Sequence, residues 1–206
     1  MSARAVSLVA LALLATACGD AAAKKDGAGS TTVSAPRPAL DIPLTPFELV
    51  DQDGKPFKSA DLDGKVWIAN FIFTTCQAVC PELTRIMASL VSKYASEPDV
   101  RFVSVTVDAD NDTPPKLREF ALKNGATSFD RWTFLTGPTD KVDATVLQNF
   151  KMAMQRNSGM AISHAERFSL VDRRGHIRGV FSVKGEGNEL DALDTALRAL
   201  LSEPAK

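Results

Sequence analysis

From residue 42 onward, apolar residues occur either in short continuous runs or at every third or fourth position. The run Val66–Phe73 is nearly continuous, which is typical of a strand covered on both faces, and Val100–Val107 is a second predicted strand, rich in Val. From Leu83 to Tyr94 the apolar positions are spaced by three and four, which predicts a helix with one buried stripe. Because strand and helix patterns alternate to the end of the chain, the sequence predicts a three-layer α/β domain.

Two hairpins are expected to flank this alternating part. Residues 47–50 and the run to Phe57 enclose Asp51-Gln52-Asp53-Gly54, where Asp-Gly supplies the positive-φ residues of a tight turn. Phe168–Val171 and Ile177–Phe181 are expected to pair across Asp172-Arg173-Arg174-Gly175. The other expected elements are a helix capped and opened by Asp112-Thr113-Pro114, a strand at Trp132–Leu135, a helix marked by Val142, Val146, Leu147 and Phe150, and a closing helix at Leu190–Leu201.

The first residues of the chain have a different pattern. Arg4 precedes thirteen small or apolar residues, from Ala5 to Ala17, fewer than the ~20 that a membrane-spanning helix needs. Residues 1–17 are therefore interpreted as a secretory signal peptide. The segment Leu14-Ala15-Thr16-Ala17-Cys18 resembles a bacterial lipobox, in which cleavage leaves a diacylated N-terminal cysteine. The alternative is an ordinary signal peptide with an incidental Cys18.

Residues 18–41 are expected to tether the domain. Between residues 19 and 39 the only larger apolar side chain is Val33, and Gly, Ala, Ser, Thr, Pro and charged residues make up the rest. Such a segment does not bury enough surface to fold. The folded domain is therefore predicted to span residues 42–206.

The composition is that of one ordinary folded domain. Of 206 residues, 45% are apolar and 24% charged, which excludes a disordered, collagen-like or multi-span membrane protein. Because 24 Lys and Arg are balanced by 25 Asp and Glu, the charge gives no sign of a nucleic-acid groove or polybasic membrane patch. Cysteine and histidine are scarce, at three and two, so each position is weighed separately.

Cys76 and Cys80 lie where the first buried strand ends and the first helix begins, with Pro81 suited to the first helical position. Free N–H groups and the positive end of the helix dipole stabilise a thiolate there, which makes it a nucleophile and a metal ligand. A structural disulfide is the alternative in an exported protein. With only three intervening residues, such a bridge removes little chain entropy. The placement therefore favours redox or metal chemistry.

His164 lies far downstream, in the stretch Asn157–Ala165 that leads into a predicted strand. In a doubly wound sheet, such a loop can return to the carboxyl end of the first strand, where the cysteines are. Two thiolates and one imidazole form a soft ligand set that suits copper in either oxidation state. Zinc is the rival, but a structural zinc site needs four ligands. A plain loop histidine is the alternative for His164.

The remaining candidate ligands are expected to have no role at the site. His176 follows the hairpin glycine and is interpreted as an exposed strand residue. Met152, Met154 and Met160 offer thioethers, but methionines at a helix end and in a loop more often serve packing.

Taken together, several motifs resemble those of the Sco/SenC family, from about Phe47 to the end of the chain. They are the hairpin pattern F-x-L-x-D-x-x-G, the segment Phe71-Ile72-Phe73-Thr74-Thr75-Cys76-Gln77-Ala78-Val79-Cys80-Pro81, Val105-Thr106-Val107-Asp108 with Asp112-Thr113-Pro114, Leu135-Thr136-Gly137, Ser163-His164, and Leu170-Val171-Asp172 with Gly175.

This resemblance implies a thioredoxin-like three-layer α/β fold with an N-terminal β-hairpin and a C-terminal β-hairpin plus helix. It implies Cys76 and Cys80 as thiolate ligands and redox pair, and His164 as the imidazole ligand, of Cu(I) or Cu(II). The implied location is the periplasmic face of the bacterial cell membrane, with a lipid anchor at Cys18.

The function implied is that of a metallochaperone that delivers copper to, or reduces the cysteines of, the dinuclear copper site of cytochrome c oxidase. Its implied partners are the copper-site subunit of the oxidase and other periplasmic copper or thiol-redox proteins, with no nucleic acid. Whether the protein also has thiol:disulfide oxidoreductase activity is left open.

Three other functions are weighed against this one. A periplasmic thiol:disulfide reductase would use Cys76 and Cys80 without metal, but such enzymes usually carry Cys-x-x-Cys and a facing cis-proline, and no proline occurs between Thr139 and Glu203. A thiol peroxidase would need a threonine three residues before its reactive cysteine, where this chain has Phe73 or Gln77. A binding module that senses redox state is the third alternative.

Overall fold

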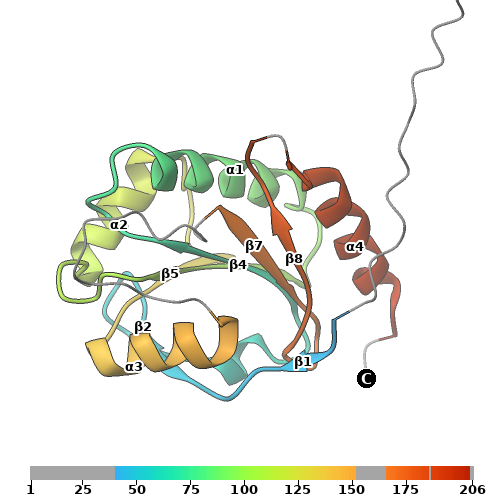
Figure 1. Cartoon of the computed structure of the whole chain (residues 1–206), viewed down its shortest axis with the longest axis horizontal. Helices are drawn as coiled ribbons and strands as arrows, with labels where there is room; N and C mark the ends of the chain where they lie inside the picture. The colour runs from blue at the N-terminus through green and yellow to red at the C-terminus, as the bar shows by residue number, and fades with distance from the viewer. Residues whose placement is uncertain (1–39, 152–165, 186, 205–206) are drawn as a thin grey trace, which may run out of the picture. The chain divides into compact units, whose positions relative to one another are not determined.

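The structure, a computed structural model, describes residues 40–151, 166–185 and 187–204. A six-stranded mixed sheet forms the middle layer of this domain (Figure 1), in the strand order β1-β8-β7-β4-β5-β6. Its strands are β1 (Ile42–Pro43), β4 (Val66–Ile72), β5 (Val100–Thr106), β6 (Trp132–Leu135), β7 (Arg167–Val171) and β8 (His176–Ser182).

The strand directions bring distant parts of the chain to one end of the sheet. Central strand β4 runs parallel to β5, and β5 runs parallel to β6. Strand β7 is antiparallel to both β4 and β8, so β8 runs in the same direction as β4. The ends of β4, β5, β6 and β8 and the start of β7 therefore share one end of the sheet, called here the carboxyl end.

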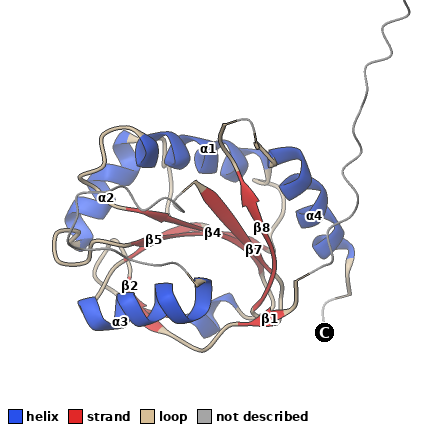
Figure 2. Ribbon diagram, viewed as in Figure 1, coloured by secondary structure: helices blue, strands red, loops and turns tan. Residues whose placement is uncertain are grey.

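Helices cover both faces of the sheet (Figure 2). One face packs against α1 (Val79–Lys93), α2 (Pro114–Lys123) and α4 (Leu190–Ser202). The other face packs against α3 (Thr139–Ala144), its π-helical continuation η2 (Thr145–Asn149), the 3-10 helix η1 (Ser59–Leu62) and the hairpin of β2 (Glu48–Val50) and β3 (Pro56–Lys58). The three-layer α/β prediction is confirmed. Among the described helices, none has the length and apolarity to cross a membrane.

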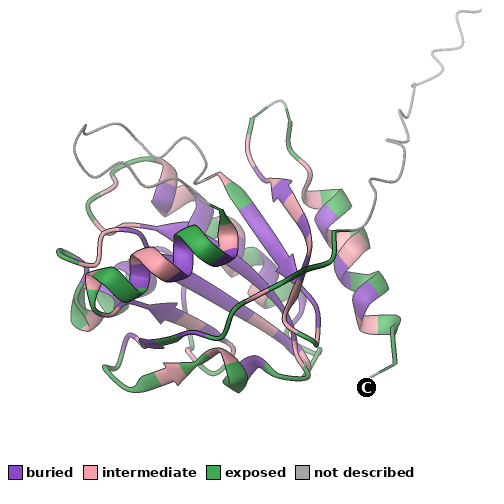
Figure 3. Cartoon of the chain, turned by 60° about the horizontal axis from the view of Figure 1, so that its bottom comes forward, coloured by how far each residue is buried: buried purple, intermediate pink, exposed green. Residues whose placement is uncertain are grey.

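Strand β4 divides the core between the two faces. All seven of its residues are buried, and Figure 3 shows the buried residues concentrated in the sheet. Ile68 and Ile72 belong to the core under α1, α2 and α4, whereas Trp67 and Phe71 belong to the core under α3 and the hairpin. Burial on both faces explains why the sequence of this strand is apolar without alternation.

Both expected hairpins are present. In the β2–β3 hairpin, Leu49 pairs with Phe57, and Gly54 has φ +75° in its turn, a backbone region that glycine enters without strain. Gly175 has φ +74° in the turn between β7 and β8, and Phe168 pairs with Phe181 across that hairpin.

The helix starts and the third helix differ from expectation. Helix α1 begins at Val79, so Pro81 is its third residue and not its first; proline is tolerated there because the first four N–H groups of a helix lack intrahelical acceptors. Asp112 does not cap α2, whose N-cap is Thr113 without a side-chain bond. The helix expected from Val142 to Phe150 is α-helical only as far as Ala144 and continues as the π-helix η2. Leu147, one of the residues that marked it, is 56% exposed.

Candidate functional site at the carboxyl end of the sheet

The sheet end and the start of α1 position the cysteine pair. Cys76 lies in the loop between β4 and α1, and Cys80 lies in the first turn of α1. The Cys76 N–H donates to the carbonyl oxygen of Phe73 at 3.2 Å, which turns the loop tightly after the strand. Neither cysteine is in a disulfide, and the structure brings the two side chains together.

Cys76 is the more accessible of the two and has the more acidic thiol. Its Sγ accepts the backbone N–H of Cys80 at 3.2 Å. Partial burial works to raise the pKa of Cys76, but hydrogen bonds from Cys80, Ala78 and Val79 outweigh it and hold that pKa below its ordinary value. This is the effect expected of free N–H groups at a helix N-terminus. At neutral pH Cys76 therefore has the larger thiolate fraction of the two, which favours it as the first to react or to bind a metal.

Cys80 has the opposite environment. Its side chain is fully buried against the core under α1. Burial raises the pKa of Cys80 well above its ordinary value, and the charges of Cys76 and Asp112 raise it further. A nucleophilic thiol next to a buried, protonated one suits a stepwise reaction in which Cys76 reacts first.

Two further charged groups face the pair. Lys184, in the loop after β8, forms an ion pair with Glu82 of α1 at 2.5 Å. The hydrogen bond to Glu82 raises the pKa of Lys184, and the charge of Cys76 contributes to the same shift. Lys184 and Glu82 thus form an ion pair between the loop after β8 and the start of α1. No local pattern in the sequence predicts this pair, because about a hundred residues separate its two members.

Asp112 lies on the other side of the cysteine loop. Its carboxylate is fully buried and accepts the backbone N–H of Thr74 at 3.0 and 3.2 Å. The hydroxyls of Thr74 and Thr106 also donate to it. In the sequence Asp112 stands two residues before Pro114, which opens α2, and this explains why capping was expected of it. Its contact with Thr74 depends on β4 and β5 being neighbours.

The other site residues lie outside the described part of the chain. His164, the Met152, Met154 and Met160 thioethers, and Cys18 are among them, so the ligand role of His164 and the lipidation of Cys18 stay predictions. The described chain resumes at Glu166, whose carbonyl oxygen accepts the Val183 N–H, at the carboxyl end of the sheet. Within the described ranges, no three His, Cys, Asp or Glu side chains form a group that could hold a metal ion.

His176 lies at the opposite end of the sheet from the cysteines, as the first residue of β8. Its side chain is 25% exposed, and Nδ1 lies 2.7 Å from a carboxylate oxygen of Asp41. It is therefore partly buried and paired, where an exposed residue was expected, and it is remote from the cysteine pair.

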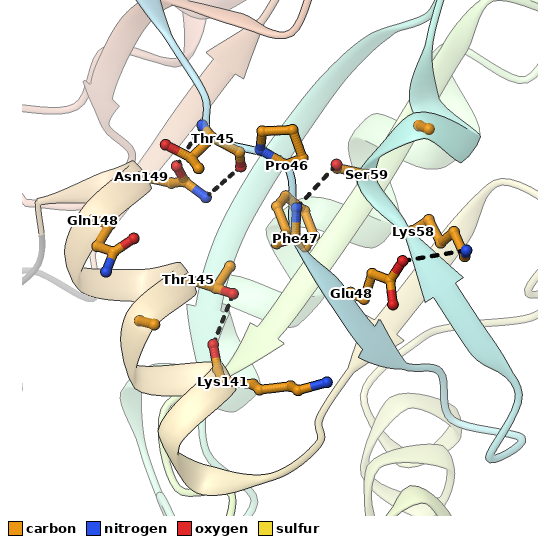
Figure 4. A pocket seen from close by; sticks show the side chains of 12 residues that line it. Thr45, Pro46, Phe47, Glu48, Lys58, Ser59, Lys141, Thr145, Gln148 and Asn149 are labelled. Carbon is orange, nitrogen blue, oxygen red and sulfur yellow. Dashed lines mark hydrogen bonds and ion pairs between the residues drawn. The ribbon is translucent and has the colours of Figure 1, made fainter.

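A cavity of about 450 Å³ lies between the N-terminal hairpin and α3, as Figure 4 shows. Its lining residues bond mainly to one another: Asn149 bonds to the backbone of Thr45, and Lys58 pairs with Glu48. None of the cysteine-site residues lines it. The cysteine pair, rather than this cavity, is the candidate functional site.

The known proteins that are similar in sequence to this chain include several SCO proteins. The sequence model of the SCO1/SenC family matches residues 38–198. The SCO1 protein homolog of Bacillus subtilis is 38% identical over 141 residues, which cover 67% of this chain and 72% of the relative. The SCO2-like protein of Rickettsia typhi is 31% identical, and the match spans 64% of its length.

Solved structures agree with this likeness. A SCO1/SenC family lipoprotein from Bacillus anthracis is 35% identical, with a TM-score of 0.70 over 81% of this chain and 99% of that one. BsSco, described as a cytochrome c oxidase assembly protein with a disulfide switch, is 33% identical, with a TM-score of 0.71 over 82% and 99%. Copper-bound yeast Sco1, 23% identical with a TM-score of 0.62 over 82% and 97%, shares the fold. These likenesses confirm the expected thioredoxin-like fold.

Proposed function

The chain belongs to the SCO1/SenC family, and we propose that it is a copper-binding metallochaperone for the dinuclear copper site of cytochrome c oxidase. The observation that carries the proposal is the cysteine pair itself: two free thiols beside a helix N-terminus, one of them acidified by backbone N–H groups. The names of its relatives support it, because they include a cytochrome c oxidase assembly protein and a copper-bound Sco1.

In this proposal Cys76, Cys80 and His164 hold the copper ion. Thiolate sulfur and imidazole nitrogen are donors that both Cu(I) and Cu(II) accept. The low pKa of Cys76 presents one thiolate before the metal arrives, whereas Cys80 releases its proton on binding, so affinity weakens as the pH falls.

The same two thiols provide a release step. If the two copper-bound thiolates of Cys76 and Cys80 form a disulfide, they pass two electrons to a partner disulfide, which takes up two protons from the solvent and becomes a dithiol. Both sulfur ligands are lost in that single step. Where the partner disulfide is that of the oxidase, the same reaction reduces the oxidase cysteines. The disulfide switch identified in BsSco supports this use of the pair.

Two histidine substitutions, one at the proposed site and one remote from it, test the copper site. His164→Ala is expected to weaken Cu(II) binding at least tenfold and to change the thiolate-to-copper absorption band, because one of three donors is removed. His176→Ala is the matched control, since His176 lies at the opposite end of the sheet, and it should leave both readouts unchanged. An unchanged affinity and band in His164→Ala would remove His164 from the site.

The alternative, a periplasmic thiol:disulfide reductase without metal, predicts a different pattern in cells. A deletion strain is complemented with the wild type, Cys80→Ser or His164→Ala, and scored for copper in the oxidase and for a general periplasmic disulfide defect. The metallochaperone proposal predicts that neither Cys80→Ser nor His164→Ala restores copper in the oxidase. Full restoration by His164→Ala, with a disulfide defect in Cys80→Ser, would favour the reductase.

For the N-terminal region we propose a signal peptide at residues 1–17, a lipidated Cys18 with a tether to residue 41, and a domain at 42–206 held at the periplasmic face of the membrane. The lipoprotein from Bacillus anthracis supports the anchor. Acyl chains contribute about 0.8 kcal/mol per buried CH₂, so several chains hold a protein stably on a membrane. Mass spectrometry of the mature protein should find acyl groups on Cys18; an unmodified Cys18 in a soluble mature protein would contradict the anchor.

A further inference from the structure

The buried carboxylate of Asp112 bonds to the loop that carries the cysteine pair. It is fully buried, and it accepts three donor groups: the N–H of Thr74, the hydroxyl of Thr74 and the hydroxyl of Thr106. Two of the three belong to Thr74, two residues before Cys76. The other belongs to β5, so the carboxylate links the cysteine loop to the neighbouring strand.

Asp112 is itself held firmly. Its N–H donates to the carbonyl oxygen of Asp108 at 2.9 Å, and the Asp108 N–H donates to the Thr106 hydroxyl at 3.0 Å. The side chain of Asn111 donates to the Asp108 carboxylate at 2.9 and 3.0 Å. This loop follows β5 directly, so the carboxylate has a defined position relative to the sheet.

Within the described residues, the side-chain hydrogen bonds of Asp112 go to the cysteine loop and to β5. A buried carboxylate is costly unless charge-assisted hydrogen bonds compensate for its lost hydration. Helix α2 starts without a side-chain cap, so Asp112 does not serve that helix. All of the compensating donors come from Thr74 and Thr106. The carboxylate is therefore placed to fix the Thr74 backbone, and through it the turn to Cys76.

We propose that Asp112 is a positioning residue for the cysteine pair. Through Thr74 it holds the loop in the conformation in which Cys76 accepts the Cys80 N–H and both thiols are free. In this proposal disulfide formation shifts the loop and weakens these hydrogen bonds, so that they favour the dithiol over the disulfide. The inference rests on the proposed function only for the use of the two thiols; it requires no metal.

The test measures the dithiol–disulfide equilibrium of the metal-free full chain in glutathione buffers. One protein dithiol and one glutathione disulfide give one protein disulfide and two glutathione thiols, so electrons and protons balance. After alkylation, mass spectrometry of the tryptic peptide spanning residues 66–85 reports this pair without interference from Cys18. Because copper is absent, a failure of the copper proposal leaves this measurement interpretable.

Two substitutions at Thr74 distinguish the effect of its hydroxyl hydrogen bond from the effect of its side-chain size. Thr74→Val removes the donor but keeps the shape and the Asp112 charge, and we expect the equilibrium to move about tenfold toward the disulfide, which corresponds to about 30 mV for a two-electron couple. Thr74→Ser keeps the donor and should stay within twofold of the wild type. An unshifted Thr74→Val, or an equal shift in both variants, would overturn the proposal.

A double-mutant cycle assigns the effect to Asp112. In an Asp112→Asn background, Thr74→Val should shift the equilibrium less than twofold, because its acceptor is already altered; a persisting tenfold shift would refute the role of Asp112. If Asp112→Asn does not fold, the comparison of Thr74→Val with Thr74→Ser tests the proposal by itself.

The matched control is Asp172→Asn. Asp172 is also buried and accepts the N–H groups of Arg174 and His176 at 2.9 and 3.0 Å, but it lies in the β7–β8 turn at the opposite end of the sheet. The substitution Asp172→Asn should lower the free energy of unfolding but shift the dithiol–disulfide equilibrium less than twofold. A tenfold shift there would mean that any loss of stability moves the couple, and the positioning role would be rejected.

Discussion

At the scale of single residues, Cys76 and Cys80 differ more than their spacing suggests. Three residues separate them, yet Cys76 is partly exposed and Cys80 is fully buried. The difference arises because Cys76 lies before α1, where backbone N–H groups point at its sulfur, whereas Cys80 lies on the inner side of the first helical turn. The two thiols therefore have different chemical roles.

This asymmetry predicts selective alkylation. At pH 7 and in the absence of metal, Cys76 should react with iodoacetamide at least tenfold faster than Cys80, since only the thiolate reacts. The Cys76 rate should fall as the pH falls through its lowered pKa, whereas Cys80 should stay protonated and slow above the ordinary thiol pKa. Mass spectrometry of the peptide spanning 66–85 gives both rates.

Denatured protein provides the control for this prediction. In guanidinium chloride both cysteines should react at similar rates and with the ordinary pH dependence of a free thiol, about 8.5. Similar rates in the native protein would show that the helix N-terminus does not acidify Cys76.

At the scale of secondary-structure elements, a charged cluster joins α1 to α4. Tyr94, directly after α1, donates its hydroxyl to Asp194 of α4. Lys93 lies 2.6 Å and Arg198 3.1 Å from the same carboxylate. Partial burial works to raise the pKa of Asp194, but these hydrogen bonds outweigh it and lower that pKa to about 2.

The cluster predicts an acid-dependent loss of stability. A carboxylate with a depressed folded-state pKa contributes stability above its unfolded value of 3.8, and this contribution is lost as the pH falls toward about 2. Asp194→Asn should therefore lower the free energy of unfolding by about 1–2 kcal/mol at pH 7, after allowance for solvent screening. Urea titrations at several pH values should show this difference shrinking below pH ~4.

An exposed carboxylate serves as the control. Asp63→Asn changes an exposed residue, so it should change the free energy of unfolding by less than about 0.5 kcal/mol at each pH. A constant difference between Asp194→Asn and the wild type down to pH 2 would contradict a depressed pKa at Asp194.

The π-helix η2 after α3 leads to a second prediction at this scale. It places Asn149 so that its amide accepts the N–H of Thr45 at 2.8 Å and donates to the Thr45 carbonyl at 3.1 Å. Asn149→Leu removes both hydrogen bonds, each of which contributes about 0.5–1.5 kcal/mol net, and should therefore cost about 1–3 kcal/mol in unfolding free energy. Gln148→Leu, at the exposed neighbouring position, should cost less than about 0.5 kcal/mol. Equal costs in urea titrations would show that the Asn149 bonds do not matter.

At the scale of the whole domain, the first described residues complete the sheet. Strand β1 pairs with the start of β8. Asp41 accepts hydrogen bonds from Arg174 at 3.1 Å, and the Leu40 carbonyl accepts one from Arg178 at 3.1 Å. These contacts protect part of an edge strand that would otherwise expose its backbone.

Truncation tests this contribution. A chain that begins at residue 38 keeps β1 and should unfold with the stability of the full chain, within about 0.5 kcal/mol. A chain that begins at residue 45 loses β1, Asp41 and Leu40, and should be about 1–3 kcal/mol less stable because several hydrogen bonds are lost. Chemical denaturation of the two truncated proteins measures the difference; equal stability would show that β1 contributes nothing.

Although β1, η1 and the π-helix η2 could not be predicted from the sequence by itself, most of the strands and helices, the place of the cysteine pair and the family could. These are local properties: apolar spacing reports burial within one strand or helix, as in β4 and α1, and Cys76 and Cys80 follow the strand directly. Even the family motifs are mostly short contiguous segments, so they could be recognised before any contact was known.

The other roles depend on contacts between separate elements, which arise only in the folded domain. Asp112 bonds to Thr74 across 38 positions of sequence, Lys184 pairs with Glu82 of α1 because β8 and β4 end on the same side of the sheet, and Leu147 is exposed on the π-helix η2 that continues α3. Strand order and direction place these side chains. The local pattern specifies burial, but it does not specify which distant group will meet a buried carboxylate or a thiol.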